Sequence, residues 1–201
     1  MTPAAIGLRA HSGWAALVSL IGPSSSPTVV SRRRIEIADP ALSGSKQPYH
    51  FVESMSLSEA SEIVARCWKS SVELAAQALA DEQRRLAAKG FQVQICGVLL
   101  GRMTEMQELE KILASHPRLH TAEGVMFRQV LLLAAEACGM HVLGVSERLV
   151  VTQISKAFGL APNAAMSRLR EMGRGLGSPW TLDQKYATAA AWLALLTMER
   201  V

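Results

Sequence analysis

Aspartate is scarce in this chain of 201 residues: among 17 acidic residues only Asp39, Asp81 and Asp183 are aspartates. Metal-dependent phosphate chemistry usually gathers several carboxylates at one point. The shortage therefore constrains any such site to these three residues and to the glutamates that the fold brings near them.

Cysteine and long apolar runs are also lacking. The three cysteines, Cys67, Cys96 and Cys138, are far apart and form no C-x-x-C motif, which argues against a disulfide framework and predicts buried thiols. No apolar run approaches the ~18 residues of a transmembrane helix, so we expect no membrane span. The run from Trp14 to Ile21 could serve as the core of a signal peptide, but we interpret it as a strand and expect a cytoplasmic protein.

What the chain does have is apolar surface and a small positive charge. Hydrophobic residues make up 49% and charged residues 19%, which excludes a mainly disordered chain and predicts a single domain over 1–201. The net charge is +4. The stretch from Arg148 to Trp180 alone carries that same net charge, so the rest of the chain sums to zero. Such a basic stretch supports salt-sensitive binding of nucleic acid, or it is an ordinary solvated face.

The first 38 residues are predicted to form strands. Three apolar or alternating segments are separated by short turns, which predicts an antiparallel meander: Ala4–Arg9, Trp14–Ile21 and Thr28–Ala38. A connecting loop follows over 39–55. Ser56 and Glu59 have the spacing of a capping box that opens a long helix, and Gly90 is expected to end it.

The remaining segments alternate between strand and helix. We predict strands at Phe91–Leu100 and Met140–Val145, and helices at Glu105–Ser115, Thr121–Gly139, Ile154–Phe158, Ala164–Met172 and Thr181–Glu199. Right-handed crossovers would place the later strands parallel to the first. The expected fold is α/β: a mixed sheet of three antiparallel strands and then parallel strands, with helices on both faces.

This order of elements resembles the ribonuclease H-like fold, and short motifs narrow the resemblance. Ile6 to Trp14 resembles the first strand and turn of RuvC-type Holliday-junction resolvases, which begin with an apolar-Gly-apolar-Asp-Pro-Gly run and have a Gly-Trp shortly after. The strand ending near Gly97 resembles their fourth strand. Lys185 to Leu195 resembles their last helix, which is rich in alanine and leucine.

The resemblance implies a two-metal nuclease site, but the acids that it requires are missing. These nucleases hold two divalent ions between carboxylates of the first strand, the fourth strand and the last helix. The matching positions are Arg9, Gly97 or Val98, and a residue near Thr188, and only Asp183 is acidic in the first turns of that helix. A permanent cation at position 9 repels a metal ion. We therefore expect no catalytic residue, no metal and no other cofactor.

Asp183 also has an interpretation that involves no metal. A carboxylate in the first turn of a helix is favoured by the helix dipole, and this is the role that we predict for it.

Three functions follow as hypotheses. The first is a catalytically inactive resolvase-like protein that binds nucleic acid or a protein partner, with a homodimer as a further option. The second is a structure-selective endonuclease that uses Mg²⁺ or Mn²⁺, with displaced carboxylates such as Glu123 or Glu147. The third is a DNA-binding regulator with a helix-turn-helix over 151–173.

The helix-turn-helix interpretation uses Ile154–Leu160 as the first helix and turn and Ala164–Met172 as the recognition helix. The turn looks about one residue too long for that motif, and two short amphipathic helices that pack on the sheet explain the same pattern. The candidate nucleic-acid-binding residues are Lys156, Arg168, Arg170 and Arg174.

His116 and His120 have the spacing of a pair of metal ligands. Pro117 lies between them and is expected to exclude a regular helix, and no cysteine or acid pair stands near them in sequence. We therefore predict two surface loop histidines and no zinc site.

Overall fold

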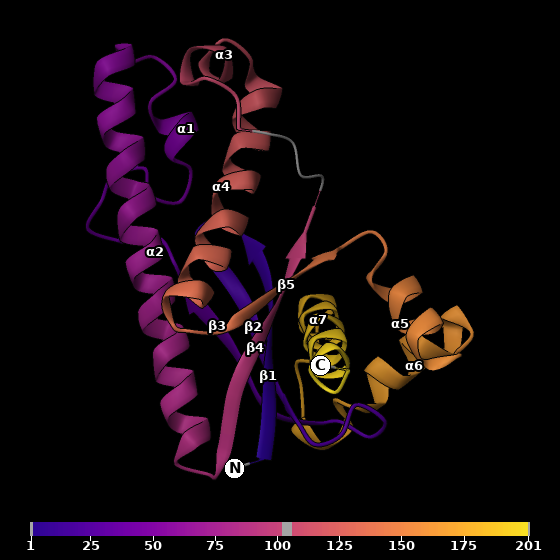
Figure 1. The fold of residues 1–201 in the computed structure, drawn as a ribbon. Coiled ribbons are helices and arrows are strands. Elements are labelled where there is room, and N and C mark those ends of the chain that lie inside the picture. The colour runs from indigo at the N-terminus through magenta and orange to yellow at the C-terminus, as the bar shows by residue number, and fades with distance from the viewer. Residues whose placement is uncertain (1, 102–105, 201) are drawn as a thin grey trace.

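A five-stranded mixed sheet forms the centre of the computed structural model, which describes residues 2–101 and 106–200. The strands are β1 (Thr2–His11), β2 (Trp14–Ile21), β3 (Thr28–Glu36), β4 (Phe91–Leu100) and β5 (His141–Ser146), in the order β3-β2-β1-β4-β5. The first three pair antiparallel, whereas β4 runs parallel to β1 and β5 parallel to β4. This is the predicted arrangement, and Figure 1 shows it between layers of helices.

The turn between β1 and β2 is tight. Only Ser12 and Gly13 separate the two strands, and Gly13 has a φ of 80°, which glycine adopts without steric cost. The carbonyl oxygen of Gly13 also accepts hydrogen bonds from the backbone N–H groups of Ile37 and Ala38, just after β3. This end of the hairpin, next to Arg9 and His11, is therefore fixed to the end of β3.

One face of the sheet is covered by α2 (Leu57–Ala87) and α4 (His116–Ala137), with the short helices α1 (Pro48–Phe51) and α3 (Leu109–Leu113) beyond them (Figure 1). The capping box of Ser56 and Glu59 is present at the start of α2. Helix α1 was not predicted; it lies inside the expected loop. The predicted start of the next helix at Glu105 lies outside the described residues.

Helix α4 begins five residues before the predicted position. Ser115 is its N-cap and a proline occupies one of the first two helical positions, where its missing N–H costs no hydrogen bond. Pro117 therefore does not exclude a regular helix, and Thr121 is not its cap: the Thr121 hydroxyl donates to the carbonyl oxygen of Pro117. His116 and His120 consequently lie one turn apart on a helix, not in a loop.

The other face is covered by α7 (Leu182–Met198), and α5 (Val150–Phe158) and α6 (Pro162–Glu171) pack against α7 from outside. Helix α7 lies very close to the sheet, since a Cβ added at Gly7 or at Gly97 would overlap the backbone carbonyl oxygen of Ala187 or Ala190. Between α6 and α7 lies the short 3-10 helix η1 (Arg174–Leu176).

The cysteines are free, as predicted, and two of the three are fully buried. Cys67 and Cys96 are buried and Cys138 is partly buried. Burial raises the pKa of each thiol above its ordinary value, which makes the reactive thiolate scarce. Among the described residues, no helix has the length and apolar character needed to cross a membrane.

Candidate functional site

Three elements bring charged side chains together at one edge of the sheet. Arg9 lies near the end of β1, Glu147 directly follows β5, and Asp183 lies in the first turn of α7. Because β1, β4 and β5 are parallel, the ends of β1 and β5 meet at the same edge. The close contact of α7 with Gly7 brings the start of that helix to the same place.

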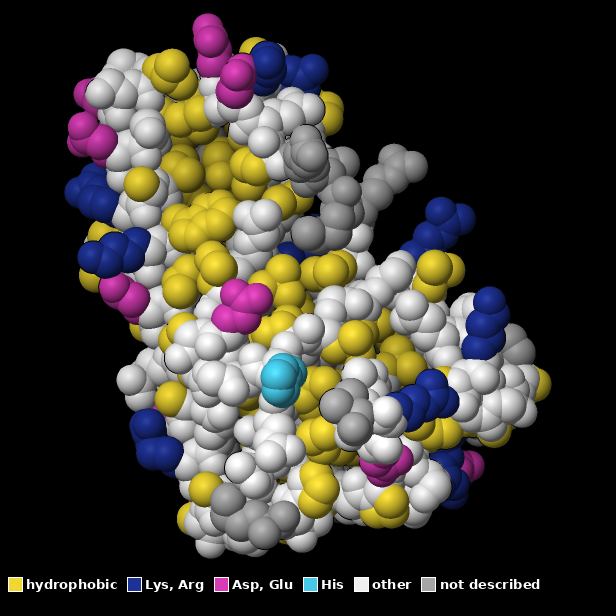
Figure 2. Space-filling model, in the orientation of Figure 1, with side chains coloured by type: hydrophobic (Ala, Val, Ile, Leu, Met, Phe, Trp, Pro, Cys, Tyr) yellow, Lys and Arg dark blue, Asp and Glu magenta, His cyan; other side chains and the backbone are white. Residues whose placement is uncertain are grey.

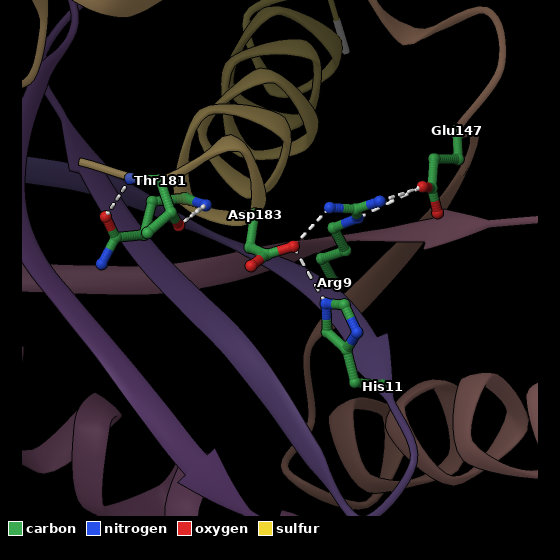
Figure 3. A network of polar contacts seen from close by, with 6 residues as sticks. Arg9, His11, Glu147, Thr181 and Asp183 are labelled. Carbon is green, nitrogen blue, oxygen red and sulfur yellow. Dashed lines mark hydrogen bonds and ion pairs between the residues drawn. The ribbon is translucent and has the colours of Figure 1, made fainter. Parts of the chain in front are cut away.

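Arg9 bridges the two carboxylates, as Figure 3 shows. Its Nε and Nη2 donate to Oε1 of Glu147 at 3.2 and 2.6 Å, and its Nη1 donates to Oδ1 of Asp183. The same oxygen of Asp183 lies 3.0 Å from Nε2 of His11. A planar guanidinium with several donors suits this double role, since such charge-assisted bonds are the strong ones.

Two aromatic side chains contact the charged groups of this network. The His11 ring stacks on Trp14, with centroids 4.1 Å apart and an angle of 6° between the planes. The guanidinium of Arg34 lies 4.1 Å from the centroid of Trp14, and that of Arg9 lies 5.2 Å from the centroid of Tyr186. These contacts connect the ion pairs to Trp14 on β2, Arg34 on β3 and Tyr186 on α7.

The site is partly open to solvent. The side chains of Arg9, Glu147 and Asp183 are 17%, 27% and 26% exposed. The charges are therefore only partly shielded from solvent. Removing one partner should cost more free energy of unfolding than at an exposed ion pair and less than at a fully buried one.

The described residues at this edge, within 2–101 and 106–200, do not fit a two-metal centre. Both carboxylates use an oxygen to accept hydrogen bonds from Arg9, and the guanidinium stands between them as a fixed positive charge. Two divalent ions need more carboxylate oxygens and no cation among them. The arrangement is a salt-bridge network of Arg9, Glu147, Asp183 and His11.

Of the three predicted positions, Arg9 and Asp183 come together and Gly97 does not join them. Gly97 pairs with Gly7 in the middle of β4 and lies directly beneath Ala190 of α7. Thr188, the expected acid position on the last helix, is buried, and its hydroxyl donates to the carbonyl oxygen of Gln184. Asp183 lies in the first turn, as predicted for a residue that the helix dipole favours, and also binds Arg9 and His11.

Of the two acids that bind Arg9, only Asp183 is predicted from the sequence to lie near it. Glu147 is predicted only as a displaced acid of the nuclease alternative, and nothing in the sequence links His11 to Asp183. The one available signal was the position of Glu147 directly after a strand that is parallel to β1. Glu123, the other displaced acid, lies on the opposite face of the sheet, where it binds His50.

The four predicted nucleic-acid-binding residues are exposed and lie on three consecutive helices. Lys156 is on α5, Arg168 and Arg170 are on α6, Arg174 is on η1, and all four are exposed. No salt bridge joins any of them to an acid within 2–101 and 106–200. Figure 2 shows Lys and Arg side chains over this part of the molecule. We name these four residues the basic surface.

Helices α5 and α6 form a compact helix–turn–helix. Phe158 ends α5 and Pro162 begins α6, so the turn has three residues and is not longer than usual, contrary to our expectation. Gly159 opens the turn in the left-handed conformation, with a φ of 63°. The buried faces of the two helices belong to the same core as α7, through residues such as Ile154 and Leu169. The pair is thus part of the fold, and its side chains Lys156, Arg168 and Arg170 are exposed.

Comparison with known proteins shows the fold. No family model matches the chain, and no curated protein matches it. Among solved structures, RuvC of Thermus thermophilus in complex with a Holliday junction substrate matches with a TM-score of 0.54 and 12% identity, over 98% of this chain and 95% of that one. A second Thermus thermophilus RuvC structure matches with a TM-score of 0.51 and 13% identity, over 98% and 96%. The chain therefore has a RuvC-like, ribonuclease H-like fold.

Proposed function

We propose that this chain is a nucleic-acid-binding protein that keeps the RuvC-like fold and does not cleave its ligand. The observation that carries the proposal is the bridge to Glu147 and Asp183 from Arg9, the position at which the resemblance places a metal-binding acid. In a two-metal nuclease, the metal ions stabilise the attacking and leaving oxygens of the phosphodiester. A guanidinium that engages the carboxylates removes the ligands for those ions.

Binding of nucleic acid is supported by the charge of the exposed surface. The four residues of the basic surface can each hold a phosphate, and Arg168 and Arg170 project from α6, the second helix of the helix–turn–helix. The similar Thermus protein was solved with a Holliday junction substrate, which makes a four-way DNA junction the first ligand to test.

Two alternatives make different predictions. The nuclease alternative is favoured by the convergence of two carboxylates, Glu147 and Asp183, at one edge; it requires Mg²⁺ or Mn²⁺ and predicts cleavage. The helix-turn-helix regulator is favoured by the three-residue turn at Gly159, and predicts binding of linear duplex as tight as that of a junction. A chain whose partner is another protein would bind no nucleic acid at low salt.

Replacing Arg168 and Arg170 together by alanine is expected to weaken binding of a labelled four-way junction by about 10-fold or more at low salt. Both side chains are exposed, so the fold is not at risk. Each lost phosphate contact also reduces the slope of log K against log salt by about 0.9. Fluorescence anisotropy at several salt concentrations, with linear duplex and single strands beside the junction, gives both values.

The matched control removes two exposed charges, one from the last turn of α2 and one from the turn after it, by replacing Arg85 and Lys89 with alanine. It changes the net charge equally but lies away from the basic surface, and we expect less than about a 2-fold change in affinity. Equal losses of affinity in the two double variants would show that binding depends only on the net charge.

Sedimentation of the free protein in the same buffer measures whether it forms the homodimer.

A further inference from the structure

Three histidines from two separate parts of the chain form a cluster on the helical layer, far in sequence from Arg9. His50 lies in α1, and His116 and His120 lie in the first turns of α4. One ring nitrogen from each of them lies within 4.8 Å of the other two. Figure 1 shows α1 beside the upper part of α4, and the two helices are in contact.

The pair on α4 already has the spacing of two ligands on one ion. Nε2 of His116 and Nε2 of His120 are 3.2 Å apart. Two nitrogens that bind one tetrahedral Zn²⁺ at the usual 2.0–2.1 Å are separated by about 3.3 Å. A hydrogen bond between the two imidazoles would explain this distance equally well, so a further observation has to decide.

That observation is an orphaned nitrogen on His50. Nδ1 of His50 lies 2.7 Å from Oε1 of Glu123, to which it must donate because a carboxylate only accepts. In the neutral imidazole, this tautomer has a lone pair on Nε2. Nε2 of His50 is buried and has no hydrogen-bond partner in the part of the chain that the structure describes. A buried acceptor without a partner is costly, and a metal ion would satisfy it.

Glu123 gives the cluster the second shell of a metal site. Its side chain is only 3% exposed and accepts hydrogen bonds from Nδ1 and from the backbone N–H of His50. Histidines that bind metals commonly donate their other ring N–H to a carboxylate, which fixes the ring and raises its basicity. The negative charge buried beside His50 also favours a cation on the other side of the ring.

We propose that His50, His116 and His120 bind one Zn²⁺ ion, which ties α1 to the start of α4. Neutral imidazoles suit Zn²⁺, and three of them leave a fourth tetrahedral position to water. His116 and His120 are exposed, so an ion can reach the site from solvent. The site lies on the face of the sheet opposite α7, and the proposal is independent of nucleic-acid binding.

The test is titration of the full chain, freed of metal by a chelator, with Zn²⁺ in a calorimeter and with Co²⁺ in a spectrophotometer. We expect one ion per chain, a dissociation constant in the micromolar range or below, visible bands of four-coordinate Co²⁺, and a higher melting temperature with Zn²⁺. His116→Ala and His50→Ala are each expected to lower the affinity by at least about 100-fold, and Glu123→Gln by about 10–100-fold.

His141→Ala is the matched control, because it removes an exposed histidine from β5 and should leave the affinity unchanged. Since His116 is exposed, its replacement also keeps the fold intact, which circular dichroism verifies. Failure of the unaltered chain to bind one equivalent of Zn²⁺, or equal affinity in the His116→Ala variant, would overturn the proposal.

Discussion

Replacing Gly7 by alanine is expected to cost the protein about 3 kcal/mol or more of its free energy of unfolding, or to leave it insoluble. A Cβ at Gly7 would overlap the carbonyl oxygen of Ala187 and the backbone nitrogen of Ala191. These are backbone atoms of α7, so no side chain can rotate away to make room. The helix would have to move off the sheet, which would open the buried contacts that it makes with β1, β2 and β4.

Urea unfolding followed by circular dichroism measures this cost. Gly175→Ala is the control, because Gly175 lies in η1 with no atom within 4 Å of an added Cβ and without a positive φ. We expect that variant to stay within about 0.5 kcal/mol of the unaltered protein. A Gly7→Ala variant as stable as the control would mean that α7 does not lie against the sheet as closely as described.

Replacing Arg9 by methionine is expected to lower the free energy of unfolding by about 1–2 kcal/mol. The change keeps much of the apolar stem but removes the donors to Glu147 and Asp183. Two partly buried carboxylates then lose their common cation. The expected cost is below that of a fully buried pair, since Glu147 and Asp183 are about a quarter exposed.

A double-mutant cycle separates the ion pairs from the packing of the Arg9 stem. In a background of Glu147→Gln and Asp183→Asn, the Arg9→Met change should cost less than half as much. Arg84→Met serves as the surface control, because Arg84 pairs with Asp81 at 65% and 41% exposure and should cost less than about 0.5 kcal/mol. An equal cost of Arg9→Met in both backgrounds would assign the effect to packing alone.

The strands and the order of layers could be predicted because they depend on local patterns. Trp14–Ile21 and Phe91–Leu100 were located to the residue, since apolar runs between turn residues mark buried strands. The predicted start of α4 is wrong because a proline, which breaks the interior of a helix, is tolerated in its first turn.

The sites were harder to predict because their residues are distant in sequence. Arg9 is 138 residues from Glu147, and His50 is 73 residues from Glu123. No spacing rule connects such pairs; only the parallel pairing of β1, β4 and β5 and the packing of α1 on α4 bring them together. The resemblance alone predicts that Arg9 stands at the position of a catalytic acid. That Glu147 binds Arg9 follows only from the fold.

The most direct test of the central proposal is to follow binding and cleavage of one labelled four-way DNA junction in the same samples, with Mg²⁺, with Mn²⁺ and with a chelator. The salt-bridge network of Arg9, Glu147 and Asp183 predicts a protein–junction complex and intact DNA strands in all three conditions. Strand cleavage that requires the metal ion, and that is lost in both the Asp183→Asn and the Glu147→Gln variants, would contradict it.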